Sequence, residues 1–389
     1  MLLVLLFLFA APPDFNQQLR AGLVALNNND LTHARQALEA AAKIQPQNPD
    51  VWIALAQTYR KLDARNLAQS AATKAEQFVA SHPASMHALA VYYSQAGNVE
   101  KAANLESRYA LTDESASADA AALWMQAGKP KAAVAYAQRA LARDDRAELH
   151  ALLAAAYDAD GKFPDAVNEY ERAIKMSPYE EGNYCDLANA YMRHQQFKSA
   201  IDVIERGRNI FDKSAQIELT LGVALYGERR FADATDAFLR TIDLDPSVER
   251  AYVFLSKMLD VVGERMPDVQ NRFAQWSAAN PKNATAKLVY AKALLASGTD
   301  DAKAATLLRS AIALKPEDWD SHYELGVLLE RQHNYAEAAD ELERSIALNA
   351  SQADAHYHLA RVFDRLGQTD RAAAERQLHA RLSAGAGIK

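Results

Sequence analysis

The sequence predicts an all-α fold, a right-handed α-solenoid of about eleven helical hairpins, and three observations carry this prediction. Apolar residues recur at helical spacing in pairs of short segments, each pair joined by a polar turn. These pairs repeat along the chain with a period of about 34 residues. The composition shows no sign of a strand: 50% of the residues are hydrophobic, and no Gly-rich or β-branched runs occur.

The stretch 322–348 shows the expected design of one hairpin. Leu325 lies on the apolar face of its first helix, and Ala338 and Leu342 lie on the apolar face of its second helix. Gly326 sits inside the first helix, where glycine costs roughly 1 kcal/mol relative to alanine. Its missing side chain therefore predicts a close approach of the second helix.

The repeats are expected to form one solenoid over residues 15–387, because each unit of a solenoid contacts only its neighbours and needs no single large core. The expected units start near residues 15, 49, 83, 114, 147, 181, 215, 249, 284, 319 and 353. Two units depart from the pattern. The one over about 249–282 has Pro267 early in its second helix, which predicts longer helices or a changed stacking angle. The one near Glu114 has Ala120 and Ala121 in place of larger residues.

The repeated pattern resembles the tetratricopeptide repeat family. The matching residues of the second unit are Trp52, Leu55, Ala56, Tyr59, Ala68 and Ala75. Prolines that close a unit after its second helix stand at Pro46, Pro178, Pro246 and Pro316. The resemblance covers almost the whole chain. It implies stacked hairpins that bind partner proteins, with the first helices lining a concave groove.

Residues 1–14 differ in character from the repeats. The run from Leu2 to Ala11 is too short to cross a membrane as a helix, but it has the length of the apolar core of a secretion signal. A basic segment before this run is missing. We expect an exported protein, periplasmic or envelope-associated, with membrane contact only through this segment. The alternative is a cytoplasmic protein whose first residues form a buried helix.

No catalytic signature occurs in the sequence. The pairs Gly128–Lys129 and Gly161–Lys162 lack the earlier glycine of a phosphate-binding loop. His356 and His358 are two residues apart on a predicted helix and point to different sides, so they do not form a metal site together. The single cysteine, Cys185, fits a small apolar packing role. We therefore expect no enzyme, no cofactor and no metal.

The expected functional surface is the concave groove. Its predicted partner-binding residues are Asn189, Arg193, Arg250, Lys257, Lys292, Tyr323, Tyr357, Arg361 and Arg365. Arginine binds carboxylates in a bidentate fashion and tyrosine supplies rigid contact area, so these residues predict an acidic partner segment. The alternative is a solvated helix face that is paired internally with Glu324, Asp354 and Asp364. The formal net charge of −7 argues against nucleic-acid binding.

These observations favour a non-catalytic scaffold that binds protein or peptide partners, in bacterial cell-envelope assembly or polymer export. Two alternatives remain: a cytoplasmic co-chaperone-like adaptor, and a docking subunit of an enzyme complex such as a glycosyltransferase. The sequence leaves the partner and the oligomeric state open.

Overall fold

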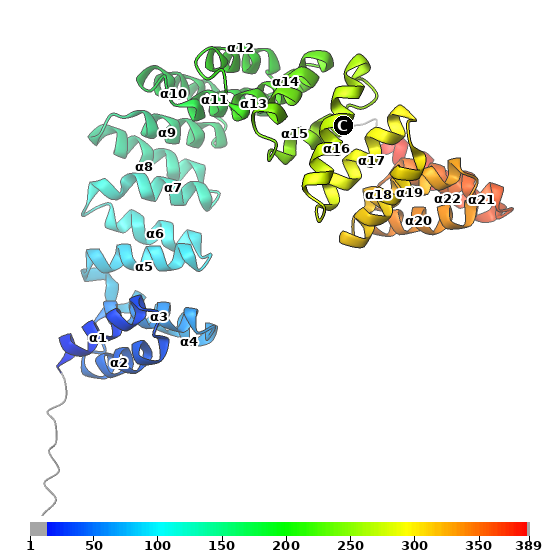
Figure 1. Ribbon diagram of the computed structural model, residues 1–389. Coiled ribbons are helices and arrows are strands. Elements are labelled where there is room, and N and C mark those ends of the chain that lie inside the picture. The colour runs from blue at the N-terminus through cyan, green and yellow to red at the C-terminus, as the bar shows by residue number, and fades with distance from the viewer. Residues whose placement is uncertain (1–13, 387–389) are drawn as a thin grey trace, which may run out of the picture. The chain divides into compact units, whose positions relative to one another are not determined.

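A computed structural model describes residues 14–386, and over that range it contains 22 α-helices, three short 3-10 helices and no strand (Figure 1). Helices that follow one another in the chain pack in pairs, as a solenoid of helical hairpins requires. The predicted all-α solenoid is confirmed. The chain divides into two compact units, Met1–Asn183 and Tyr184–Lys389, which we call the N-terminal and C-terminal units.

The helices of the N-terminal unit are α1 (Phe15–Asn27), α2 (Leu31–Ile44), α3 (Pro49–Lys61), α4 (Arg65–Phe78), α5 (Pro83–Gln95), α6 (Val99–Tyr109), α7 (Ser117–Gln126), α8 (Pro130–Arg143), α9 (Ala147–Ala159) and α10 (Phe163–Met176). The 3-10 turns η1 (Val79–Ser81) and η2 (Glu114–Ala116) precede α5 and α7. Helix α11 (Glu181–Arg193) spans the division between the units.

The helices that lie wholly in the C-terminal unit are α12 (Phe197–Arg208), α13 (Ala215–Gly227), α14 (Phe231–Leu244), α15 (Glu249–Ser256), α16 (Met266–Ala279), α17 (Ala284–Ser297), α18 (Asp301–Leu314), α19 (Trp319–Arg331), α20 (Tyr335–Leu348), α21 (Ala353–Arg365) and α22 (Thr369–Ala386). The turn η3 (Gly263–Arg265) precedes α16. Odd-numbered helices are the first helices of their hairpins, and even-numbered helices are the second.

Glycine in a first helix marks the closest approach within a hairpin. A Cβ atom added to Gly326 would lie 2.7 Å from Leu342 Cγ on the second helix, and one added to Gly222 would lie 2.6 Å from the Phe238 ring. Real Cβ atoms do not come this close to other atoms, so only glycine fits without a shift of the neighbouring side chain or of its helix. The close approach expected at Gly326 is therefore present, and the neighbour is a large side chain.

Aromatic side chains near the start of first helices hold the loop that precedes them. The Trp52 indole N–H donates to the carbonyl oxygen of Pro46 at 2.7 Å, and the Tyr252 hydroxyl donates to that of Pro246 at 3.2 Å. These prolines thus end one hairpin and offer the acceptor that fixes the start of the next.

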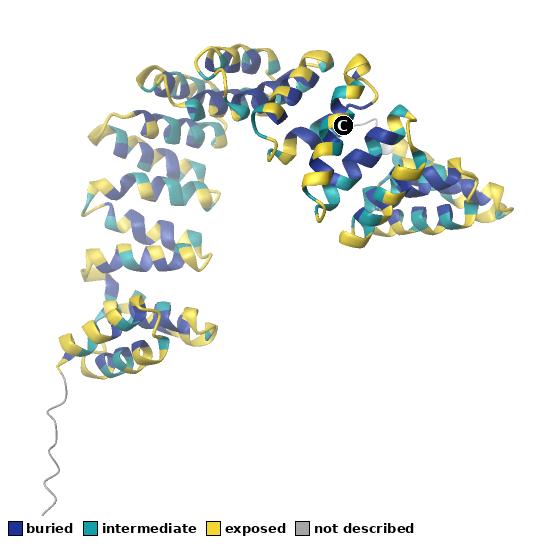
Figure 2. Ribbon diagram, viewed as in Figure 1, coloured by how far each residue is buried: buried dark blue, intermediate teal, exposed yellow. Residues whose placement is uncertain are grey.

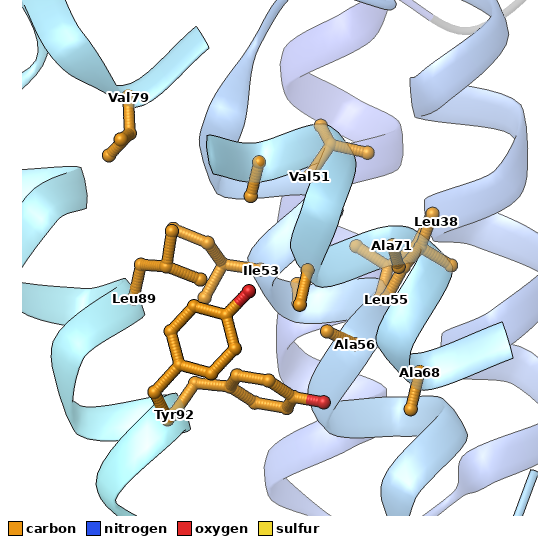
Figure 3. Packing of buried hydrophobic residues seen from close by; sticks show 14 of the residues in the cluster. Leu38, Val51, Ile53, Leu55, Ala56, Ala68, Ala71, Val79, Leu89 and Tyr92 are labelled. Atoms are coloured by element: carbon orange, nitrogen blue, oxygen red, sulfur yellow. The ribbon is translucent and has the colours of Figure 1, made fainter. Parts of the chain in front are cut away.

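Buried residues run along the middle of each stack, while exposed residues gather at helix ends and turns (Figure 2). Figure 3 shows the core where α2 to α5 meet, with Leu38, Leu55 and Leu89 fully buried and Tyr92 close to Leu89. Small residues such as Ala56 stand between these larger side chains and let the helices approach each other.

The hairpin of α15 and α16 is irregular, as the sequence pattern indicates, but in a different way. Its first helix has 8 residues, whereas α13 and α19 have 13 each. The expectation of longer helices is therefore wrong for α15. The Tyr252 ring stacks on Trp276 of α16 with centroids 4.2 Å apart, so two large rings separate the helices. Pro267 lies in the first turn of α16, where its missing N–H costs nothing.

The run from Leu2 to Ala11 lies outside the described residues, so the expected secretion signal stays a prediction. Within residues 14–386, no helix combines the length and the apolar character that crossing a bilayer requires. The single domain expected over 15–387 also stays a prediction.

Candidate functional site

The first helices α17, α19 and α21, together with the chain that follows α15, carry a row of polar and aromatic side chains. We call this row the C-terminal first-helix face, and it consists of Lys257, Asp260, Lys292, Asp320, Tyr323, Glu324, Glu330, Tyr357, His358, Arg361 and Arg365. Contacts between neighbouring first helices join many of these residues, so the row is one surface of the unit.

Lys292 on α17 reaches two carboxylates on α19. Its Nζ atom lies 3.0 Å from Asp320 Oδ2 and 3.2 Å from Glu324 Oε1, and all three side chains are only about a quarter exposed or less. Burial raises the pKa of Glu324, and Lys292 offsets only part of this shift. Burial lowers the pKa of Lys292, but Glu324 and Asp320 outweigh it and the pKa ends above its usual value. Lys292 is thus a paired cation.

A second cluster joins α19 to α21 around His358. The imidazole Nδ1 of His358 lies 2.6 Å from Glu330 Oε2, and the guanidinium Nε of Arg361 lies 3.2 Å from Glu330 Oε1. The His358 ring meets the Tyr323 ring edge to face, with centroids 5.9 Å apart. Burial raises the pKa of Tyr323, and the nearby Glu324 adds to the shift, so this tyrosine stays neutral.

Tyr357 continues this cluster toward solvent. Its side chain is 44% exposed, the His358 ring stands edge-on to it at 5.3 Å, and Arg361 lies over its face at 5.6 Å from the ring centroid. An exposed tyrosine held by neighbouring rings and a guanidinium presents apolar area at low entropic cost, as interface hot spots do.

The other predicted groove residues lie on the expected helices but outside these clusters. Asn189 and Arg193 belong to α11, three hairpins before α17; Asn189 is half-buried and Arg193 is exposed. Arg250 on α15, Lys257 directly after α15 and Arg365 at the end of α21 are exposed. Lys257 also lies 5.7 Å from the centroid of the Phe254 ring.

The alternative of internal pairing therefore applies to some of the predicted cations. Glu324 pairs with Lys292, but Asp364 pairs with Arg376 on α22 and not with a predicted groove residue. Sequence reasoning missed Glu330 and His358, which hold Arg361 and Tyr323 in place. Glu330 is buried and His358 is half-buried, and a helical pattern does not show that these two side chains of neighbouring repeats meet.

Two hollows flank the irregular hairpin in the C-terminal unit. One has a volume of 520 Å³ and lies on the C-terminal first-helix face. It is bordered by α17, by α19 and by the residues that follow α15. The other, of 440 Å³, lies mainly between α12, α14 and α16 and is rich in arginine. Its arginines are engaged: Arg272 pairs with Asp243, and both Arg208 and Arg240 hold the buried carboxylate of Glu218.

The described residues offer little for metal or thiol chemistry. No group of three or more His, Cys, Asp or Glu side chains among residues 14–386 is placed to hold a metal ion. Cys185 is buried. What the C-terminal first-helix face can do is make charge-assisted and apolar contacts with another chain.

Comparison with known proteins gives a consistent family assignment. Models described as tetratricopeptide repeat match residues 119–181, 185–249, 300–351, 323–386 and 15–58, which together cover more than half of the chain. A curated relative, the small glutamine-rich tetratricopeptide repeat-containing protein 2 of Mycosarcoma maydis, is 30% identical over 84 residues. This match spans 22% of the chain and 24% of that relative.

Solved structures resemble the chain along most of its length. Yeast Tom70 aligns over 95% of this chain and 92% of its own, with 14% identity and a TM-score of 0.43. The Cut9–Hcn1 hetero-tetramer of the APC/C aligns over 96% and 94%, with 12% identity and a TM-score of 0.46. These TM-scores lie below 0.5, so they carry no argument about function. On the family models, the chain belongs to the tetratricopeptide repeat family.

Proposed function

We propose that the chain is a non-catalytic adaptor that binds an acidic segment of a partner protein on the C-terminal first-helix face. The observation that carries this proposal is the row of charged and aromatic side chains on α17, α19 and α21, at positions that the packing of the hairpins does not use. The exposed aromatic area of Tyr357 is unfavourable in water, and a partner that covers it removes that cost.

The preference for an acidic segment depends on the cations that have no internal carboxylate. Lys257 and Arg365 on this face, and Arg250 on α15, are exposed and form no ion pair with other residues in the range 14–386. Lys292 and Arg361, in contrast, already share carboxylates with the protein. The three unpaired cations are therefore the ones expected to contact a partner's carboxylates directly.

The experiment captures partners from cells with the tagged chain and compares wild type with the double variant Lys257→Ala/Arg365→Ala. We expect the variant to lose most of the captured partner, and we expect the wild-type complex to weaken as salt rises, since exposed charge pairs are screened beyond about 10 Å at 0.1 M. The matched control is Arg309→Ala on the second helix α18, which removes an exposed arginine paired with Glu337.

A partner that binds the double variant and wild type equally would contradict the proposal. Loss of binding in the Arg309→Ala control instead would place recognition on the second helices. Melting of each variant by circular dichroism separates loss of binding from loss of fold.

We also propose that the protein acts in the bacterial cell envelope, in assembly or polymer export. The apolar run from Leu2 to Ala11 supports this proposal. The N-terminal residue of the protein purified from its host is the test. A mature chain that starts near Ala11 or Pro12 is the expected result, and intact Met1 on protein from the cytosol would favour a cytoplasmic adaptor instead.

A further inference from the structure

An apolar cavity opens on the C-terminal first-helix face where α15 stops early. Helix α15 ends at Ser256 after 8 residues, and the turn that follows lines the cavity together with α17 and α19. Its volume is 520 Å³. Cavities of about 300–1,000 Å³ are the size that holds small ligands and bulky side chains.

The walls of the cavity are mostly aliphatic. Leu259 and Leu328 form buried parts of the wall, and Leu295 and Val327 are half-buried at its opening. Apolar surface that remains accessible to water is unfavourable, and covering it with another apolar group gains roughly 25 cal/mol per Å². The cavity therefore favours an apolar occupant.

The rim of the cavity is charged. It carries three cations, Lys257, Lys292 and Arg331, and two carboxylates, Asp260 and Glu324. Lys292 pairs with Glu324, and Arg331 donates to Asp301 at 2.6 Å, so two of the cations are already engaged. Lys257 is exposed and has no ion pair among the described residues. A carboxylate beside the occupant would complement it.

We propose that this cavity is an anchor subsite for one bulky apolar side chain of the partner's acidic segment, with a flanking carboxylate next to Lys257. The inference rests on the proposed function, because it names the side chain that the acidic segment inserts. The subsite exists because the shortened α15 leaves open a place that a longer first helix would fill.

The test uses two synthetic fluorescein-labelled peptides of glutamate residues, one with a central tryptophan and one with a central serine. Each is titrated with the full chain and followed by fluorescence anisotropy. We expect the tryptophan peptide to bind about tenfold more tightly, which corresponds to about 1.4 kcal/mol. Lys257→Ala should weaken both peptides and keep the ratio between them.

A variant that narrows the cavity locates the subsite. Ala296→Phe adds a ring at a cavity-lining position of α17 that is exposed, and it should bring the affinity ratio of the two peptides close to one. The matched control is Ala122→Phe on α7 in the N-terminal unit, which should keep the ratio. In the wild type, the tryptophan peptide should shift the methyl resonances of Leu295 and Val327, and the serine peptide should not.

The outcomes separate this inference from the proposed function. Equal binding of both peptides by the wild type would overturn the anchor subsite and leave the acidic-segment proposal standing. A ratio that survives in a folded Ala296→Phe variant, or unmoved Leu295 and Val327 methyl resonances, would also overturn the subsite. Failure of both peptides to bind the wild type would overturn the two proposals together.

Discussion

In both units the first helices have a small residue at the position that packs on the second helix, which we call the packing position. They differ at the outward-facing positions next to it. In α7 the residue that faces the second helix is Ala121, and in α9 it is Ala154. The residues three before and one after this position are alanines too: Ala118 and Ala122 in α7, and Ala151 and Ala155 in α9. In α19 and α21 the packing residues are Gly326 and Ala360, and the same neighbouring positions include Tyr323, Tyr357 and Arg361.

This difference teaches that a first helix carries two independent sets of residues, one that packs on the second helix and one that faces outward. The packing position is buried and small in both units, with Ala121, Ala154, Gly326 and Ala360 all inaccessible to solvent. The neighbouring positions are partly or largely exposed, so they change without disturbing the hairpin. Stability should therefore respond to the packing position, and recognition should respond to its neighbours.

The largest expected effect is on stability, at the packing position. Gly326→Leu places a side chain where even a Cβ atom would lie 2.7 Å from Leu342 Cγ, and overpacking of this kind costs about 1–3 kcal/mol or more. Gly222→Leu should lower the free energy of unfolding in the same way, because its side chain would clash with the Phe238 ring. Urea unfolding measures the loss. In the control Gly182→Ala the added methyl group meets nothing closer than 3.5 Å, so this variant should unfold no more easily than wild type.

Equal unfolding midpoints for Gly326→Leu, Gly222→Leu and wild type would mean that the packing position does not carry stability. The division of the helix into two sets of residues would then be wrong.

A smaller loss of stability is expected for Lys292→Met, because Asp320 and Glu324 would be left half-buried without their cation. The cost should be about 1–2 kcal/mol at pH 7, between that of an exposed and a buried pair. Burial already raises the pKa of Glu324, so its carboxylate is the costly form, and acid relieves that cost by protonating it.

The stability deficit of Lys292→Met should therefore be full at neutral pH and shrink as the pH falls through the raised pKa of Glu324. Urea unfolding of both proteins at pH 7 and pH 5 measures it. A deficit that grows on acidification would contradict the assigned pairing.

A substitution at an outward-facing position next to the packing position should affect partner binding far more than folding. Tyr357→Ala removes a side chain that is 44% exposed, and we expect a stability loss of at most about 1 kcal/mol. Partner affinity should fall, and low salt should not restore it, because the tyrosine contributes mainly buried area. Binding measured at two salt concentrations checks this, with Lys257→Ala as the salt-sensitive comparison.

The smallest effect is expected from a substitution that gives a first helix of the N-terminal unit an outward-facing side chain of the C-terminal unit. Ala155→Arg introduces an arginine at the position that Arg361 occupies in α21, and the free energy of unfolding should change by about 0.5 kcal/mol or less. A large loss would show that the alanines of α9 are needed for packing, and it would remove the comparison between the units.

The fold could be predicted from the sequence because its signals are local and repeated. Gly326 and Leu342 stand sixteen residues apart, as Gly222 and Phe238 do, so one hairpin predicts the next. The short α15 could not be predicted in the same way. Its helical pattern does not show where the helix ends, nor that Tyr252 stacks on Trp276 of the next helix.

The candidate site was only partly predictable, since a helical pattern assigns a side chain to a face but not to a partner. Lys292 was expected on the outward face, and it is there, but Asp320 and Glu324 of the next first helix neutralise it. These partners lie about one repeat away in the chain, so their distance from Lys292 follows from stacking and rotamers, not from spacing. His358 was overlooked for the same reason.

Hydrogen–deuterium exchange of the chain with and without its captured partner tests most directly whether recognition lies on the C-terminal first-helix face. The account predicts slower exchange in peptides from α17, α19 and α21 when the partner is bound, and unchanged exchange in α7 and α9. Protection confined to the second helices, or to the alanine-lined first helices of the N-terminal unit, would contradict it.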